Sequence, residues 1–400
     1  MKKNAQTALI HAPRKAPQYV STIQPPLFRA STIIFDNTNA LFNRHWTDHY
    51  DYSYGTHGTP TTFTLADNIA QLEGGEFCLL APSGLSAINL VNSCFLSQGD
   101  EVWVADNIYG PNMEHLRNLE TRYGITVKVY NPIDVASFQP TKKAKLIWLE
   151  AAGSVTLEFP DLNNLVKKAK AHHVLSALDN TWGAGLAFNA FDFGDEHLSV
   201  DLTVHALTKY PSGGGDILMG SVVTRDEKLH QQLFRIHALQ GISISGDDAA
   251  QVQRSLASMQ IRYQHQSEST LTLLTWLKQQ TEFAQVLHPA DETSAGHAYW
   301  KEICSTEQSA GLVSVIFKPE YHLKDVRHFC DALSLFKLGF SWGGPISLVM
   351  LYNLKEMRTL EHTHLQQGLL VRFCIGLEHP QDLIQDIKNA LKQLKRQQLE

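Results

Sequence analysis

The chain has 400 residues, of which 43% are hydrophobic and 18% are charged, with 25 glycines and 15 prolines. This composition is typical of a globular protein with two or three domains, and it excludes a disordered chain, a collagen-like repeat and a coiled coil. The formal net charge of -6, with both signs interspersed along the chain, argues against a protein that binds nucleic acid or anionic membranes.

Three further features bear on location and metal binding. No apolar run approaches the roughly 18 residues that a membrane-spanning helix needs. The first residues, Met1–Gln6, lack the apolar stretch of a secretory signal, so a soluble, cytoplasmic protein is expected. The five cysteines are few, odd in number and without zinc spacing, which predicts reduced thiols and no metal site.

Residues 1–50 show no sustained periodicity and contain the turn-forming run Gln24-Pro25-Pro26. A segment of this kind cannot bury itself. It is therefore predicted to form an extended N-terminal arm that packs on the body of the protein or on a neighbouring subunit.

From about residue 60 helical and strand patterns alternate. The predicted elements are a helix at 64–72 stopped by Gly74-Gly75, strands at 77–81, 101–105, 146–149 and 174–178, and helices at 85–95 and 162–171. The strands lack clean alternation and are separated by helices, which predicts a mostly parallel sheet covered on both faces. We assign residues 51–246 to this large domain.

The pattern changes near residue 246. Residues 247–283 have a long helical pattern, and they are followed by predicted strands at 312–317 and 371–375 and a closing helix at 382–394. This mixture predicts a smaller α+β domain at residues 247–400.

Ligands of open α/β sheets bind beyond the carboxyl ends of the strands, so the residues that follow each predicted strand are candidates for a site. Ser83-Gly84-Leu85 lie between a strand and a helix. The N–H groups of Gly84 and Leu85 would lie at the helix N-terminus, where a phosphate is favoured. A purely structural turn explains this segment equally simply.

Two charged residues follow later strands. Asp179, at the end of a buried strand, loses water and needs a cationic partner such as a protonated pyridine nitrogen, although a loop-stabilising role is the alternative. Lys209 lies among apolar and hydroxyl residues and precedes Gly213-Gly214-Gly215, which could also be a plain turn. Desolvation would lower its pKa and make the free amine available for Schiff-base chemistry.

Together these three places form the set that pyridoxal phosphate (PLP) requires. Lys209 would hold the aldehyde, Asp179 would keep the pyridine nitrogen protonated, and the helix N-terminus would take the phosphate. The sequence therefore predicts a PLP enzyme.

The order and spacing of motifs over nearly the whole chain resemble the PLP enzymes of cysteine and methionine metabolism, and within that family the cystathionine β-lyases. The matching motifs are Tyr54-Gly55-Thr56-His57-Gly58-Thr59, Leu72-Glu73-Gly74-Gly75, Ser83-Gly84-Leu85, Tyr109-Gly110-Pro111, Leu149-Glu150 with Gly153-Ser154, Asp179-Asn180-Thr181-Trp182, Thr208-Lys209-Tyr210, Ser341-Trp342-Gly343-Gly344, and Arg372 ahead of Ile375-Gly376-Leu377-Glu378.

The resemblance implies the aspartate-aminotransferase-like fold, fold type I, assembled as a homotetramer of dimers with shared active sites. It implies catalytic roles for Lys209, Tyr109 and Tyr54, with Tyr54 reaching the site of the partner subunit. It implies cofactor binding by Lys209, Asp179, Tyr109, Ser83, Gly84, Leu85, Thr208, Tyr54 and Thr181, and substrate binding by Arg372, Ser341, Trp342 and Tyr109.

Two positions depart from the family pattern. Thr56 stands where the family usually has an arginine that contacts the phosphate, and Ala206 stands where many members have serine. Their loss would weaken phosphate binding by about 1.5–4 kcal/mol if nothing replaced them. His57, next to Thr56, is a candidate replacement.

The implied reaction is α,β-elimination from the amino-acid thioether L-cystathionine, which gives homocysteine, pyruvate and ammonia. The Ser341–Gly344 loop resembles that of β-lyases, whereas γ-acting relatives more often have leucine at the position of Trp342. Methionine γ-lyases typically place cysteine after the stacking tyrosine, where this chain has Gly110-Pro111. The alternatives are a cysteine-S-conjugate β-lyase, a cystathionine γ-lyase or γ-synthase, and a methionine γ-lyase.

Two other classes are weaker hypotheses. A non-catalytic homologue would have lost at least one of Lys209, Asp179, Tyr109 and Arg372, and all four are present. A nicotinamide dehydrogenase is excluded because no predicted strand is followed by GxGxxG and an acidic residue about 20 positions later.

Overall fold

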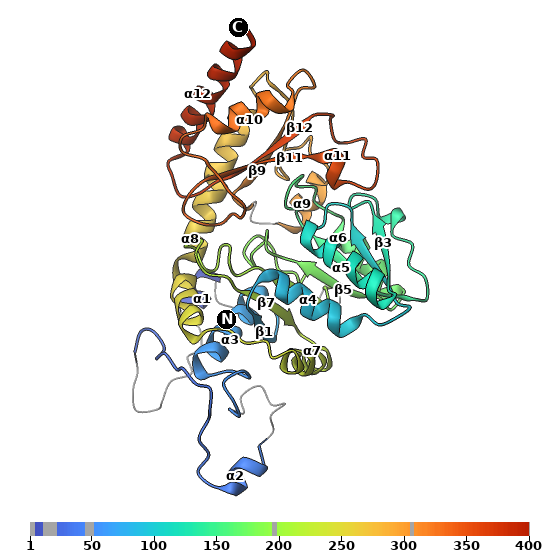
Figure 1. Cartoon of the computed structure of the whole chain (residues 1–400), viewed down its shortest axis with the longest axis vertical. Coiled ribbons are helices and arrows are strands. Elements are labelled where there is room, and N and C mark those ends of the chain that lie inside the picture. The colour runs from blue at the N-terminus through green and yellow to red at the C-terminus, as the bar shows by residue number, and fades with distance from the viewer. Residues whose placement is uncertain (1–4, 11–21, 45–51, 194–197, 305–307, 400) are drawn as a thin grey trace.

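The computed structural model describes residues 5–10, 22–44, 52–193, 198–304 and 308–399. A large α/β body occupies the centre of the molecule, with a smaller sheet domain on one side and an extended arm on the other (Figure 1). In the described part, no helix has the length and apolar character needed to cross a membrane.

The large sheet has seven strands in the order β1-β7-β6-β5-β4-β2-β3. Their bounds are β1 Phe77–Ala81, β2 Glu101–Ala105, β3 Thr126–Tyr130, β4 Ala144–Glu150, β5 Leu175–Asp179, β6 Leu202–His205 and β7 Gly220–Thr224. Strands β6, β5, β4, β2 and β3 pair in parallel, and β7 is antiparallel to both of its neighbours, β1 and β6. This confirms the predicted mostly parallel sheet.

Helices cover both faces of this sheet. They are α3 Pro60–Glu73, α4 Gly84–Phe95, α5 Gly110–Tyr123, α6 Leu162–Ala171 and α7 Glu227–Leu239. Within β4, Leu146 and Trp148 pack with α4, α5 and α7, whereas Ile147 and Leu149 pack with α3 and α6. Successive strand residues point to opposite faces, so a strand buried on both sides shows no alternation in its sequence.

The smaller sheet has five strands in the order β10-β11-β12-β9-β8. They are β8 Phe283–Leu287, β9 Leu312–Phe317, β10 Lys337–Leu338, β11 Leu348–Asn353 and β12 Leu369–Cys374. All pairs except β10–β11 are antiparallel. With the helices α9 His297–Ile303, α10 Leu323–Asp331, α11 Leu354–Met357 and α12 Pro380–Leu399, this part is the predicted α+β domain.

Helix α8, Gly246–Leu277, runs along one side of the molecule from the large domain to the small one (Figure 1). Side chains of its first half, including Val252 and Tyr263, belong to the core of the large sheet, and Leu273 and Leu277 belong to the core of the small sheet. The predicted helical stretch to residue 283 is too long. Phe283 instead begins β8, because its ring packs at 5.0 Å from that of Phe317 in the neighbouring strand.

The N-terminal arm is only partly extended. Helix α1, Ala5–Ile10, packs on α3 and α8 with Leu9 buried, so the prediction of an extended segment is wrong there. Residues 22–31 lie on the body, where the Phe28 N–H donates to Thr61 Oγ1 of α3 at 2.8 Å and Arg29 pairs with Asp247 of α8. Beyond them the chain extends away, with α2, Thr38–Phe42, at the far end (Figure 1). Residues 11–21 and 45–50 lie outside the described part, and the predicted contact with a neighbouring subunit stays a prediction.

The segment after β11 joins the small domain to the large one through two buried acids. Arg358 Nη2 lies 2.8 Å from Glu158 Oε1, and His364 Nε2 lies 3.1 Å from the same oxygen. His362 Nε2 lies 2.6 Å from Asp106 Oδ2. Burial raises the pKa of Glu158, but the charge of Arg358 and the hydrogen bonds from His364 and Thr156 hold it below the ordinary value.

We expect Arg358→Ala to lower the free energy of unfolding by about 3–5 kcal/mol, because Glu158 would stay buried without its cation. Urea unfolding at neutral pH, followed by circular dichroism, measures this loss. Arg327→Ala is the matched control, since this arginine is exposed on α10. A loss that is equal in the two variants would contradict the importance of the buried pair.

The same pair makes stability depend on pH. Since the pKa of Glu158 is lower in the folded chain than its ordinary value of 4.5, its stabilisation is present in full above pH 4.5. It is lost as the pH falls through the folded-state pKa. Arg358→Ala should weaken this dependence.

Candidate active site

A cavity lies at the carboxyl ends of the parallel strands, where the topology places a ligand. It is lined by Ser83, Gly84, Leu85, Ile88, Tyr109, Glu150, Ala152, Ser154, Asp179, Thr181, Trp182, Val204, Ala206, Thr208, Lys209, Leu218 and Trp342. Nine of the residues predicted for the site therefore lie together, although they come from positions 83 to 342.

Lys209 lies in a turn after β6, and the N–H of Lys209 donates to Ala206 O at 3.0 Å. Its Nζ donates to Ser341 Oγ at 2.7 Å and lies 4.5 Å from the centroid of the Trp342 ring. Burial, and then the positive charge of Arg372, lowers the pKa of Lys209 to about 8. The amine is therefore far more often neutral near pH 7 than that of an exposed lysine, as a nucleophile or base requires.

The loop that carries Ser341 and Trp342 comes from the small domain. Ser341 has φ 92°, in the left-handed region, which costs a non-glycine residue about 1–3 kcal/mol. Gly343 has φ 75°, and a Cβ there would lie 2.9 Å from the backbone N of Tyr210. Glycine therefore lets this loop approach the Lys209 turn closely enough for Ser341 to reach Nζ.

Asp179 ends β5, and its partly buried side chain lines the cavity. Its Oδ1 accepts a hydrogen bond from the Thr181 N–H at 3.0 Å, and burial raises its pKa. Among the described residues none forms an ion pair with Asp179, although the charges of His205 and Lys209 favour its ionised form. A cation bound next to this carboxylate would stabilise its charge further.

Helix α4 begins at the opposite wall. Ser83 Oγ caps the helix by accepting the Ser86 N–H at 3.0 Å, and in the described chain the N–H groups of Gly84 and Leu85 donate to no protein acceptor. A Cβ on Gly84 would lie 2.7 Å from Cβ of Ala206, so these small residues pack tightly. Free N–H groups at a helix N-terminus attract an anion.

Thr208 and Thr181 also face this wall, but their hydroxyl groups already bond to backbone. Thr208 Oγ1 donates to Met219 O at 3.2 Å and accepts the Met219 N–H at 3.0 Å. Thr181 Oγ1 accepts the Ala206 N–H at 2.9 Å. Thr208 would have to redirect its hydroxyl hydrogen to donate to a phosphate.

Tyr109 precedes helix α5, and its ring, 37% exposed, lines the cavity. Its N–H donates to Glu150 Oε2 at 2.7 Å. Burial, and then the charges of Asp179 and Glu150, raises the pKa of Tyr109. The phenol is therefore protonated at neutral pH and can donate a proton or stack on a bound ring.

Arg372, on β12, lies next to the cavity rather than in its lining. Its guanidinium lies 5.2 Å from the centroid of the Trp342 ring, and Nη1 donates to Ser154 O at 2.7 Å. Its side chain is buried, and Nε has no hydrogen-bond partner among the described residues. A buried guanidinium with a free N–H is suited to a carboxylate.

Tyr54, Thr56 and His57 lie apart from the cavity. Tyr54 is half-exposed, and Thr56 and His57 line a separate hollow with Phe234. Burial, and then the charge of Arg44, lowers the pKa of His57, so its ring does not supply the charge of the missing arginine at pH 7. The role predicted for Tyr54 at the site of a partner subunit stays a prediction.

Several residues that line the cavity could not be assigned to the site from the sequence. Glu150, Ser154 and Trp182 stand in recognised motifs, but no role was assigned to them. Glu150 shared the signal that identified Asp179, since both are acids at the end of an apolar strand. Leu218 carries no such signal, because its place depends only on how the chain folds back.

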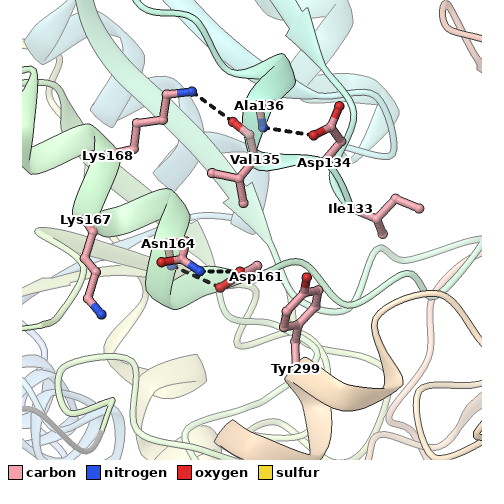
Figure 2. Close-up of a pocket in the computed structure, with 9 residues that line it drawn as sticks. All are labelled: Ile133, Asp134, Val135, Ala136, Asp161, Asn164, Lys167, Lys168 and Tyr299. Atoms are coloured by element: carbon pink, nitrogen blue, oxygen red, sulfur yellow. Dashed lines mark hydrogen bonds between the residues drawn. The ribbon is translucent and has the colours of Figure 1, made fainter.

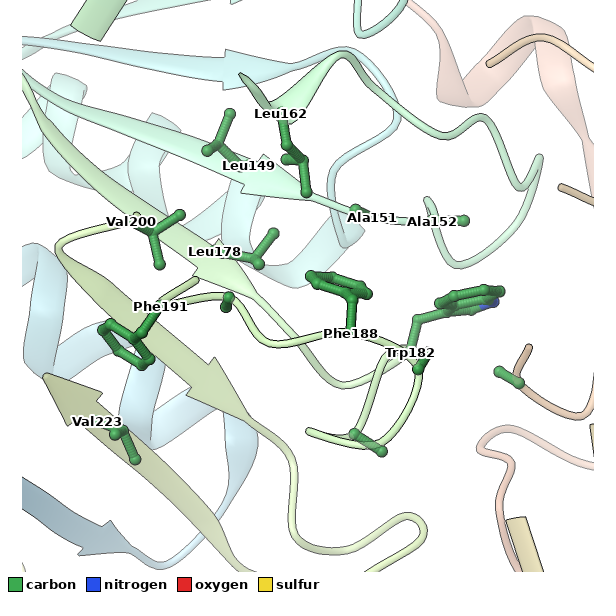
Figure 3. Close-up of a cluster of buried hydrophobic side chains, with 14 of the residues drawn as sticks. Leu149, Ala151, Ala152, Leu162, Leu178, Trp182, Phe188, Phe191, Val200 and Val223 are labelled. Atoms are coloured by element: carbon green, nitrogen blue, oxygen red, sulfur yellow. The ribbon is translucent and has the colours of Figure 1, made fainter. Parts of the chain in front are cut away.

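A second hollow on the surface contains none of the predicted residues (Figure 2). It is lined by Ile133, Asp134, Val135, Ala136, Asp161, Asn164, Lys167, Lys168 and Tyr299. Lys168 Nζ already donates to Val135 O at 3.0 Å. The candidate active site is therefore the cavity at the carboxyl ends of the strands. It lies next to the buried cluster that contains Leu149, Leu178 and Trp182 (Figure 3).

The residues of the cavity fit PLP. Free N–H groups at α4 suit a phosphate, the buried carboxylate of Asp179 suits a protonated ring nitrogen, and the buried amine of Lys209 suits an aldehyde. These groups have three different chemistries and line one cavity.

Comparison with known proteins agrees with this fit. The family described as Cys/Met metabolism PLP-dependent enzyme matches residues 6–392. The chain is 35% identical to a cystathionine β-lyase from Bordetella avium over 397 residues, which are 97% of this chain and 98% of that protein. It is 30% identical to an L-alanine/L-glutamate racemase from Wolbachia pipientis wMel over 399 residues, 97% of each chain.

The fold also matches solved structures. A cystathionine γ-synthase from Xanthomonas oryzae pv. oryzae, solved in complex with cystathionine, has a TM-score of 0.85 and 27% identity, and the match covers 99% of this chain and 100% of that one. Similar proteins thus include β-lyases, γ-acting enzymes and a racemase.

Proposed function

Because the chain belongs to the PLP-dependent enzymes of cysteine and methionine metabolism, we propose that it catalyses α,β-elimination from L-cystathionine. The products are homocysteine, pyruvate and ammonia. The observation that supports this most directly is the Lys209 amine, which is buried, lies beside Trp342 and Ser341 and has a lowered pKa.

The residues of the cavity have distinct tasks in this reaction. PLP, when bound, supplies an electron sink that makes the Cα proton of an amino acid acidic. The Arg372 guanidinium holds the substrate α-carboxylate, and Ser341 Oγ keeps the Lys209 amine in place. The Lys209 amine takes the Cα proton, and either Lys209 or the Tyr109 phenol returns a proton to the leaving sulfur.

The position of Trp342 supports β- rather than γ-elimination. β-Elimination needs a proton removed only at Cα, whereas γ-elimination needs a second proton removed at Cβ. Trp342, whose ring lies 4.5 Å from Lys209 Nζ, stands where γ-acting relatives more often have leucine. A cysteine-S-conjugate β-lyase shares this chemistry and differs only in the leaving thiol.

A product assay tests the proposal. We expect purified enzyme with PLP to release pyruvate from L-cystathionine, with little 2-oxobutyrate. Separate arms supply a cysteine S-conjugate, L-alanine and L-glutamate, and chiral chromatography detects D-amino acids. Dominant 2-oxobutyrate would contradict β-elimination in favour of a γ-acting enzyme, and D-alanine or D-glutamate without pyruvate would favour the activity named for the Wolbachia relative.

The resemblance predicts the assembly of the protein, and the sequence predicts its location. A homotetramer with shared active sites and a cytoplasmic location stay predictions. Residues 32–44, which extend from the body, support contact with another subunit, since Phe42 on α2 is 79% exposed.

A further inference from the structure

Glu150 connects two loops of the site. It is the last residue of β4, and its side chain is 4% exposed. Its Oε2 accepts the Tyr109 N–H at 2.7 Å, and its Oε1 accepts the Ser154 N–H at 2.8 Å. One carboxylate therefore fixes the backbone at the start of α5 and the backbone of the loop after β4.

These loops reach different parts of the proposed substrate. The first loop places the Tyr109 ring at the cavity wall, and the second places Ser154 O, which accepts a hydrogen bond from Arg372 Nη1 at 2.7 Å. A continuous set of hydrogen bonds thus runs from Tyr109 through Glu150 and Ser154 to Arg372. A shift of the Glu150 carboxylate would therefore move the Tyr109 ring relative to the Arg372 guanidinium.

The neighbour of Glu150 in the sheet is Asp179, which pairs with it in register. Both side chains line the cavity. Burial, and then the charge of Asp179, raises the pKa of Glu150 to about 8. Burial and the adjacent Asp179 disfavour the charge of Glu150, so retaining this acid here carries a cost in stability that its hydrogen bonds offset only in part.

We propose that Glu150 is a positioning residue for the β-elimination, because its two oxygens set the distance between the Tyr109 wall and the Arg372 guanidinium. This inference rests on the proposed function for its kinetic consequence. The structural part of the inference, that Glu150 connects the Tyr109 and Ser154 loops, does not depend on the proposed function.

Glu150→Gln tests the tie because the amide keeps the size of the side chain but can accept only one of the two N–H groups. We expect faster hydrogen–deuterium exchange in peptides that contain Tyr109 or Ser154, measured by mass spectrometry on enzyme with PLP. Glu101→Gln is the matched control, since Glu101 is buried at the opposite end of the sheet and accepts hydrogen bonds from Thr141. Unchanged exchange at both loops in Glu150→Gln would overturn the proposal.

The kinetic test separates positioning from general damage. We expect Glu150→Gln to raise KM for cystathionine and to lower kcat/KM by about 10- to 100-fold, since misplacing reacting groups by about 1 Å costs up to about 10². Glu150→Asp keeps both acceptor oxygens on a shorter side chain and should restore part of the loss. A lower kcat with unchanged KM in both variants would contradict the link to Arg372.

A titration tests whether the Glu150 side chain lies next to Tyr109 in solution. The Glu150 charge helps to raise the pKa of Tyr109, so Glu150→Gln should lower that pKa. Near-ultraviolet difference spectra of the cofactor-free protein follow tyrosine ionisation, and Tyr109→Phe in each background identifies the Tyr109 contribution. An unchanged Tyr109 titration would count against the proposal.

These readouts also separate the two proposals. If the wild-type enzyme fails to release pyruvate, the proposed function fails, whereas exchange and titration still decide the role of Glu150. If Glu150→Gln does not fold, Glu150→Asp, whose oxygens are drawn back by one methylene, carries the exchange and kinetic measurements.

Discussion

Lys209→Ala is expected to lower kcat/KM for L-cystathionine by at least about 10³-fold, because the variant loses the base that removes the Cα proton and the amine that bonds the cofactor aldehyde. In the structure this amine has a pKa lowered by burial to about 8 and a hydrogen bond to Ser341. Pyruvate release under saturating PLP measures the effect.

A second measurement on the same variant does not depend on turnover. Borohydride reduction of the wild-type enzyme should fix the cofactor to the peptide that contains Lys209, as seen by mass spectrometry, and the variant should lack this adduct. Lys228→Ala, at an exposed lysine of α7, is the control. An adduct at another lysine, or full activity in Lys209→Ala, would refute the assignment.

Arg372→Lys is expected to have the next largest effect, with a rise in KM rather than a change in cofactor content. Loss of one hydrogen bond to a charged group costs about 1.5–3 kcal/mol, which corresponds to roughly 10- to 150-fold in kcat/KM. Lysine keeps the charge but not the planar fork, and it cannot donate to Ser154 O and to a carboxylate with the same geometry.

Initial rates over a range of cystathionine concentrations measure the effect, and absorbance of the bound cofactor shows that the variant is loaded. Arg122→Lys, at an exposed arginine of α5, is the matched control. If Arg372→Lys changes kcat alone, Arg372 does not hold the substrate carboxylate.

Much of the fold could be predicted because the buried strands and their helices leave local patterns. The strands at 77–81, 101–105 and 312–317 and the helix at 162–171 have the predicted bounds. In contrast, β6 was missed because its four residues include Thr203 and His205, whose burial depends on neighbouring strands and on Glu73. Such short polar strands are defined by tertiary pairing rather than by sequence pattern.

The same difference between local pattern and tertiary contact decides which residues of the site could be predicted. Lys209 and Asp179 could be found because their own surroundings in the sequence are apolar. The tie from Glu150 to Tyr109 and Ser154 could not, since it depends on how β4 and β5 align and on where two loops turn. The role predicted for Tyr54 depends on a second chain, which a single sequence does not place.

Helix α8 has a consequence for the whole molecule. The first half of α8 is buried with the large sheet and its second half with the small sheet. Unfolding of either domain would therefore expose apolar side chains on the half of α8 that packs on it. Helix formation is itself cooperative. The core of the large sheet therefore depends on a helix from the C-terminal part of the chain. A cut at the predicted boundary between 246 and 247 would leave an N-terminal fragment without the α8 side chains of its core and a C-terminal fragment with those side chains uncovered.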